Sequence, residues 1–140
     1  NGDSHGDIAV GAPMQTANGG EVHIFYGGPG AFDTTPDRIL SIAQVGAMYG
    51  EVVANVGDLD GDGLVELGIG APLADIGGAT DAGVAYFYAG STSGIGPLPR
   101  VEIQSATAQN RFTQSMVGAG DVNGDGFADV AIGERGSSAQ

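Results

Sequence analysis

The sequence contains no cysteine and no lysine among its 140 residues. Without cysteine, the chain can form neither disulfide bonds nor thiolate metal sites. Only four arginines oppose 17 acidic residues, so the formal net charge is −13. Nucleic acids and anionic membrane surfaces bind basic patches, and this charge balance excludes both as partners. The sequence also lacks an apolar run near the roughly 18 residues of a membrane span, so no membrane insertion is expected.

Glycine is abundant instead, with 27 residues beside an apolar content of 41%. That apolar content is too high for a disordered chain, and short alternating apolar segments that end at glycine are typical of β-strands. The segments of this kind are 7–13, 20–26, 37–42, 51–57, 66–72, 83–88, 100–105, 114–120 and 129–133. No stretch has a convincing helical period over ten or more residues, so the sequence predicts an all-β fold.

The chain repeats itself with a period of about 60 residues. "GDLDGDGLVELGIGAP" at 57–72 aligns with "GDVNGDGFADVAIGER" at 120–135, and "NGDSHGDIAVGAP" at 1–13 aligns with both. In the strand that follows the first two copies, alternate residues are matched as pairs: Val22 with Val84, Ile24 with Tyr86, and Tyr26 with Tyr88. The repeat covers the whole chain.

Four short antiparallel strands per repeat resemble one blade of a β-propeller. The sequence therefore predicts a partial blade at 1–45 that lacks its first strand, a complete blade at 46–109, and the first two strands of a blade at 110–140. Propellers need about four blades or more, so we expect an excerpt of a longer propeller. The alternative is a short chain that completes its sheets with neighbouring copies, because exposed sheet edges invite pairing.

Acidic residues are concentrated in three loops, with two at 1–7, four at 58–66 and three at 121–129. In 58–66, oxygen-bearing side chains stand at relative positions 1, 3, 5 and 9, and glycine stands at position 6. This is the first part of a calcium loop of the EF-hand kind, in which position 7 adds its carbonyl oxygen. The predicted ligands are Asp58, Asp60, Asp62, the Leu64 carbonyl and Glu66; Asp121, Asn123, Asp125, the Phe127 carbonyl and Asp129; and Asn1, Asp3, the His5 carbonyl and Asp7.

These loops differ from a true EF-hand, because Ile69 and Ile132 stand where its bidentate glutamate belongs. A strand on each side of the loop fits better, and a bound divalent cation would remove the repulsion between the carboxylates. The alternative is an ordinary hairpin turn, for which Asp-Gly and Asn-Gly suffice. Magnesium fits less well than Ca²⁺, since it usually keeps several waters.

These motifs resemble FG-GAP repeats of the kind found in integrin α-subunit propellers and in many secreted bacterial proteins. Gly11-Ala12-Pro13 and Gly70-Ala71-Pro72 match the GAP element, Tyr49-Gly50 matches FG conservatively, and "GDLDGDG" and "GDVNGDG" match the calcium loop. The departures are Phe112-Thr113 and Gly133-Glu134-Arg135. The resemblance implies a seven-bladed propeller outside the cell or on its surface, with structural calcium ions in hairpin loops on one side and ligands on the other face.

The resulting prediction is a calcium-stabilised extracellular module for adhesion or for recognition of a protein or glycan ligand, without catalysis of its own. One alternative is a non-catalytic domain of a larger secreted hydrolase, and another is a structural module that self-assembles through open sheet edges. His23 is expected to be packed or hydrogen-bonded rather than catalytic. The strand aromatics are expected to pack between blades; they are Phe25, Tyr26, Tyr86, Phe87 and Tyr88.

Overall fold

The computed structural model describes residues 1–15, 19–30 and 33–136. The regular secondary structure in this part of the chain consists of β-strands. Within the same residues, no helix has the length and hydrophobicity that a membrane span requires. The strands are β1 (Ile8–Ala12), β2 (Glu21–Phe25), β3 (Arg38–Ser41), β4 (Val52–Gly57), β5 (Glu66–Ala71), β6 (Val84–Tyr88), β7 (Val101–Gln104), β8 (Ser115–Gly120) and β9 (Asp129–Gly133). Each lies in a segment for which the sequence predicts a strand, so the all-β prediction is confirmed.

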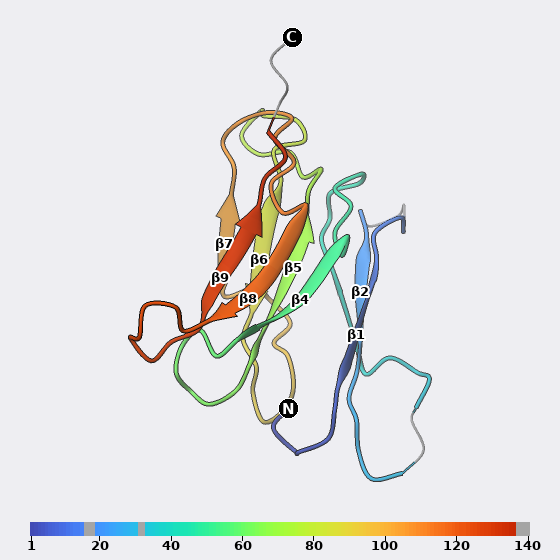
Figure 1. Cartoon of the computed structure of the whole chain (residues 1–140). Helices are drawn as coiled ribbons and strands as arrows, with labels where there is room; N and C mark the ends of the chain where they lie inside the picture. The colour runs from blue at the N-terminus through green and yellow to red at the C-terminus, as the bar shows by residue number, and fades with distance from the viewer. Residues whose placement is uncertain (16–18, 31–32, 137–140) are drawn as a thin grey trace.

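The strands form three antiparallel sheets that follow one another along the chain (Figure 1). The first sheet has the order β1-β2-β3, the second β4-β5-β6-β7, and the third β8-β9. Every strand pairs with its neighbour in sequence, so each sheet is an antiparallel meander. Small meanders of up to four strands that pack face to face agree with part of a β-propeller.

The second sheet lies between the other two, and its central strands β5 and β6 are covered on both faces. One face packs against the first sheet, where Ile69 and Tyr86 meet Val22 and Ile24. The opposite face packs against the third sheet, where Met116 joins the second hydrophobic cluster. All residues of β5 and β6 are buried as a result. This explains why "GVAYFY" reads as an almost continuous apolar run, since a strand covered on both sides has no polar face.

The predicted match between the third strands of the first two repeats is wrong by one residue. Ile8 pairs with Phe25 in the first sheet, whereas Leu67 pairs with Tyr88 in the second. Since Ile8 and Leu67 both directly follow the last residue of an acidic loop, Phe25 corresponds to Tyr88 and His23 to Tyr86. A strand that is apolar on both faces does not fix its register by alternation, so the sequence pattern could not reveal the slip.

Tyr49 closes the interface between the first two sheets, at the position that matches the phenylalanine of FG. Its side chain is fully buried, and its hydroxyl donates a hydrogen bond of 2.7 Å to the hydroxyl of Tyr88. Its ring meets Tyr86 edge-on, with 5.5 Å between the ring centroids. Next to it, Gly11 lies so close to Gly50 that a Cβ on Gly11 would overlap the Gly50 carbonyl.

Candidate metal centre

The loop between β4 and β5 is organised around Asp58. The carboxylate of Asp58 accepts a hydrogen bond from the N–H of Gly61 at 2.7 Å and another from Gly63 at 2.8 Å. Both glycines have positive φ angles, +78° and +85°, and this conformation turns their N–H groups inward at little steric cost. These hydrogen bonds, chiefly the one from Gly63, hold the pKa of Asp58 below its usual value. Asp58 therefore remains a carboxylate at neutral pH.

Glu66 closes the same loop and begins β5. Its side chain is buried, with Oε2 accepting from the N–H of Leu59 at 2.6 Å and Oε1 accepting from Gly90 at 3.4 Å. Burial raises the pKa of Glu66, and the neighbouring charges of Asp60 and Asp62 raise it further. A buried carboxylate with negative neighbours is stabilised when a cation binds beside it.

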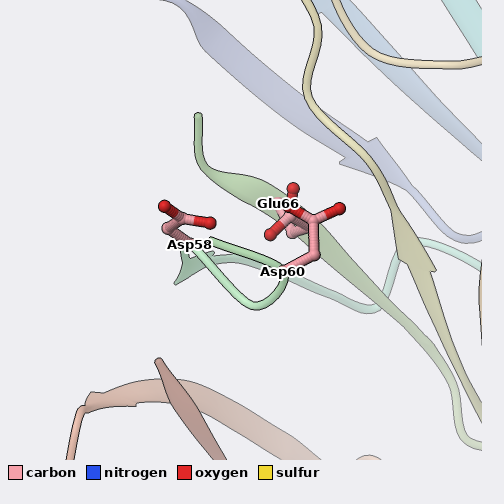
Figure 2. Close-up of side chains that lie close together, drawn as sticks. All are labelled: Asp58, Asp60 and Glu66. Carbon is pink, nitrogen blue, oxygen red and sulfur yellow. The ribbon is translucent and has the colours of Figure 1, made fainter. Parts of the chain in front are cut away.

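Three carboxylates converge in this loop. Asp58, Asp60 and Glu66 each bring one oxygen to within 4.8 Å of the others, and Figure 2 shows them gathered where the loop leads into β5. Calcium binds oxygens at about 2.3–2.6 Å, so two ligands of one ion lie up to roughly 5 Å apart. The spacing and the hard oxygen donors therefore fit a divalent cation such as Ca²⁺. Asp62 stands outside this group, and its Oδ1 accepts from the N–H of Leu64 at 2.9 Å.

The loop between β8 and β9 repeats the same hydrogen bonds. Asp121 accepts from the N–H groups of Gly124 and Gly126 at 2.7 and 2.8 Å. The Asp129 carboxylate accepts from Val122 at 2.9 Å, as Glu66 accepts from Leu59. The hydrogen bond from the N–H of Gly126 is the main cause of the lowered pKa of Asp121, as that from Gly63 is for Asp58. Within the described residues, however, the acids of this loop do not reach the close convergence of Asp58, Asp60 and Glu66.

The N-terminal loop has a shorter version of the arrangement. Asp7 accepts from the N–H of Gly27 at 2.9 Å, which corresponds to the contact of Glu66 with Gly90. Asp3 accepts from the N–H of His5 at 2.9 Å, and this hydrogen bond is the main cause of the lowered pKa of Asp3. The Oδ1 atom of Asn1 accepts a hydrogen bond from the backbone N–H of Asp3 at 3.2 Å.

Sequence reasoning missed three groups from outside the acidic loops that contact these acids. The N–H of Gly27 donates to Asp7, the last acid of the first loop, and the N–H of Gly90 donates to Glu66, the last acid of the second. The only sequence signal for these contacts is the glycine that follows each of the strands β2 and β6. The third group is the guanidinium of Arg100, whose Nη1 contacts Asp60 Oδ2. Nothing in the spacing of the sequence connects these two residues. The carbonyls of Leu64, Phe127 and His5 remain predicted ligands.

The sequence matches one protein-family model and is similar to several integrin alpha chains. Residues 115–139 match the family model described as FG-GAP repeat. Integrin alpha-4 of Xenopus laevis is 34% identical over an alignment of 140 positions, which covers 95% of this chain and 13% of that protein. Integrin alpha-IIb of Mus musculus is 31% identical over 99% of this chain, and integrin alpha-5 of Xenopus laevis is 30% identical over 97%. The chain spans about one seventh of the length of these relatives, 13–14%.

Proposed function

Since this chain is an integrin α-like FG-GAP repeat domain, we propose that it is a calcium-stabilised β-propeller module for adhesion or ligand recognition outside the cell. It has no catalysis of its own in this proposal, and its partner is a protein or glycan ligand. The role of the protein is to hold a rigid surface in place. The acidic loops fix the hairpins of the blades, and loops elsewhere on the same blades present the binding surface.

The convergence of Asp58, Asp60 and Glu66 carries this proposal. Calcium supplies positive charge at a point where three carboxylates would otherwise repel one another. Asp58 and Glu66 are already oriented by backbone N–H groups from within and beside the loop, so few side chains need to be ordered on binding. The loop at 121–129 has the same backbone scaffold and is proposed to bind a second ion through Asp121, Asn123, Asp125, Phe127 and Asp129.

The three sheets support the proposed division into blades. The unit 1–45 contains β1–β3, the unit 46–109 contains β4–β7, and the unit 110–140 contains β8 and β9. Within the residues that the structure describes, only the middle unit has four strands. Residues 16–18, 31–32 and 137–140 of the outer units lie outside the described residues.

Thermal unfolding with and without calcium tests the proposal. Each site that binds only the folded state contributes about 2.7 kcal/mol when free calcium is 100-fold above the dissociation constant. We expect the melting temperature to fall by several degrees when excess EDTA replaces calcium, and magnesium to restore little of the loss. The variant Asp58→Asn should lower the calcium-dependent part of the shift. An unchanged melting temperature in EDTA would contradict the proposal.

Glu51→Gln is the matched control for Asp58→Asn. Glu51 is exposed and immediately precedes β4, at the opposite end of that strand from the acidic loop. The control removes one negative charge and should leave the calcium-dependent shift intact. If both variants weaken the shift equally, calcium acts through the overall charge of the protein and the proposed loop site is wrong.

Exposed apolar residues on the outer sheets favour a second, structural role. Ile8 and Val10 are 45% and 48% exposed, although the corresponding Leu67 and Ile69 of the second sheet are buried. Val117 of β8 is 59% exposed. Such faces are stable when further blades or another copy of the chain covers them. Light scattering separates these cases, since self-assembly through these faces predicts a mass above that of the monomer at micromolar concentration.

A further inference from the structure

The connection between β6 and β7 is attached to the acidic loop at both of its ends. Near its start, the N–H of Gly90 donates to Glu66. At its end, the guanidinium of Arg100 contacts the Oδ2 atom of Asp60. The backbone of Arg100 is held in place by a 2.8 Å hydrogen bond from its N–H to the Phe87 carbonyl, so the base of its side chain is fixed. The connection therefore delivers a positive charge to one particular carboxylate of the proposed calcium site.

The charges of the three loops show why this carboxylate has a cationic partner. Position 3 of the loop is an acid only in the second repeat, where it is Asp60; the other loops have Asn1 and Asn123 there. The loop 58–66 thus has four acidic residues, whereas 121–129 has three. The chain has only four arginines and no lysine. One of these rare cations is placed against the additional carboxylate, which returns the local charge to that of the third loop.

We propose that Arg100 is a built-in counter-ion that competes with the divalent cation for Asp60. This inference rests on the proposed function, because it concerns the regulation of the same site. In the ion-free state the guanidinium neutralises Asp60 and keeps the loop closed. When a cation binds, its charge repels the guanidinium and replaces it as the partner of Asp60. Arg100 therefore stabilises the empty loop and lowers the affinity of the loop for calcium.

The geometry of the pair allows this exchange. Both oxygens of Asp60 have partners, since Oδ1 accepts from the N–H of Asp62 at 3.3 Å and Oδ2 contacts Arg100. The Arg100 side chain is 62% exposed, against 27% for Asp60. The guanidinium can therefore leave Asp60 and remain hydrated. An exposed ion pair of this kind is weak enough for a divalent cation to displace it. The second loop is consequently set to fill at a higher calcium concentration than it would without Arg100.

The test is a calcium titration of Arg100→Gln followed by NMR at individual glycine amides. Gly61 and Gly63 report on the second loop, while Gly124 and Gly126 report on the third loop in the same sample. We expect Arg100→Gln to tighten calcium binding at the second loop by about fivefold, the equivalent of about 1 kcal/mol, and to leave the third loop unchanged. The conservative variant Arg100→Lys should stay close to the wild type, and so should Arg135→Gln, which removes an arginine beyond β9.

Thermal unfolding of Arg100→Gln gives a second and opposite readout. In EDTA its melting temperature should fall by about 2–4 °C, because the empty loop loses its counter-ion. The gain in melting temperature on adding calcium should be larger than in the wild type. A purely structural role for Arg100 would instead lower the melting temperature equally in both conditions, and that result would overturn the inference.

The double variant Asp60→Asn/Arg100→Gln completes the design. It gives position 3 the neutral residue found at Asn123, so removing Arg100 in the Asp60→Asn background should no longer tighten calcium binding. Tightening that persists without Asp60 would refute the proposed pair. Should the wild type show no calcium dependence at all, the proposed function itself fails. A calcium-dependent wild type with no change in Arg100→Gln refutes only the role of Arg100.

Discussion

The hydroxyl pair of Tyr49 and Tyr88 gives a prediction that sequence similarity alone would reverse. Phenylalanine occupies the position of Tyr49 in the FG element, so the resemblance suggests that Tyr49→Phe is harmless. In the structure, Tyr49 is fully buried, Tyr88 is 2% exposed, and their hydroxyls are 2.7 Å apart. Removing the Tyr49 hydroxyl leaves that of Tyr88 buried without this partner. We therefore expect Tyr49→Phe to destabilise the fold.

The magnitude follows from the cost of leaving a buried polar group unpaired, about 1–3 kcal/mol. Each single variant, Tyr49→Phe or Tyr88→Phe, should lose that amount of unfolding free energy. The double variant removes both hydroxyls and should cost less than about 1 kcal/mol, since replacing both partners by apolar groups is nearly neutral. The coupling energy in the double-mutant cycle is the difference between the summed single losses, about 2–6 kcal/mol, and the loss of the double variant, so it is at least about 1 kcal/mol.

Urea unfolding at a fixed calcium concentration measures these differences, provided that the slope of the transition is the same in all variants. Tyr86→Phe serves as the control, because its ring also touches Tyr49 but its hydroxyl is not part of the pair. The control should lose less unfolding free energy than either single variant of the pair. The reasoning is refuted if Tyr49→Phe matches the wild type, or if the double variant loses the sum of the single losses.

Two further predictions concern close packing and alkaline pH. Gly11→Ala should lower the free energy of unfolding in urea by more than about 3 kcal/mol, because the added Cβ would overlap the Gly50 carbonyl. The control Gly28→Ala, where no atom lies within 4 Å of the added Cβ, should be neutral. Equal losses of unfolding free energy in the two variants would exclude close approach as the cause. Burial raises the pKa of Tyr86 to about 12 from a usual 10.0, so the native state retains a proton that the unfolded chain releases. Stability should be complete below pH 10 and fall between pH 10 and 12, by up to about 1.4 kcal/mol per pH unit for this tyrosine, and an unfolding midpoint unchanged at pH 11 would contradict the expectation.

The strands could be predicted because their sequence signals are local. Alternating β-branched and aromatic residues ended by glycine mark each strand, and the repeat multiplies a weak signal into a clear one. The acidic loops were visible for the same reason, since their polar residues lie at alternate positions of one short segment. The residue-by-residue correspondence between β2 and β6, the equivalent strands of two repeats, was not visible, because residues on both faces of β6 are apolar.

Contacts between distant segments were also beyond the sequence. Arg100 lies 40 residues from Asp60, and its role depends on the path of the connection between β6 and β7. Thr113 is a second case. It replaces the glycine of FG, yet it keeps the backbone of Gly50, with φ at +76° and its N–H bonded to Gly133 as Gly50 is bonded to Gly70. A buried β-branched residue in this conformation is rare, and no local rule predicts that the surrounding packing will hold it there.

The three acidic loops gather nine of the 17 acidic residues of the chain. All three loops precede equivalent strands, β1, β5 and β9, and lie toward the lower end of the molecule in Figure 1. Arg111 and Arg135 lie next to the far ends of β8 and β9, away from their connecting loop. The negative charge gathered in these loops attracts cations before any contact is made. Under the proposed function, ions bound in the loops would offset this charge and so weaken the repulsion between like molecules at low ionic strength.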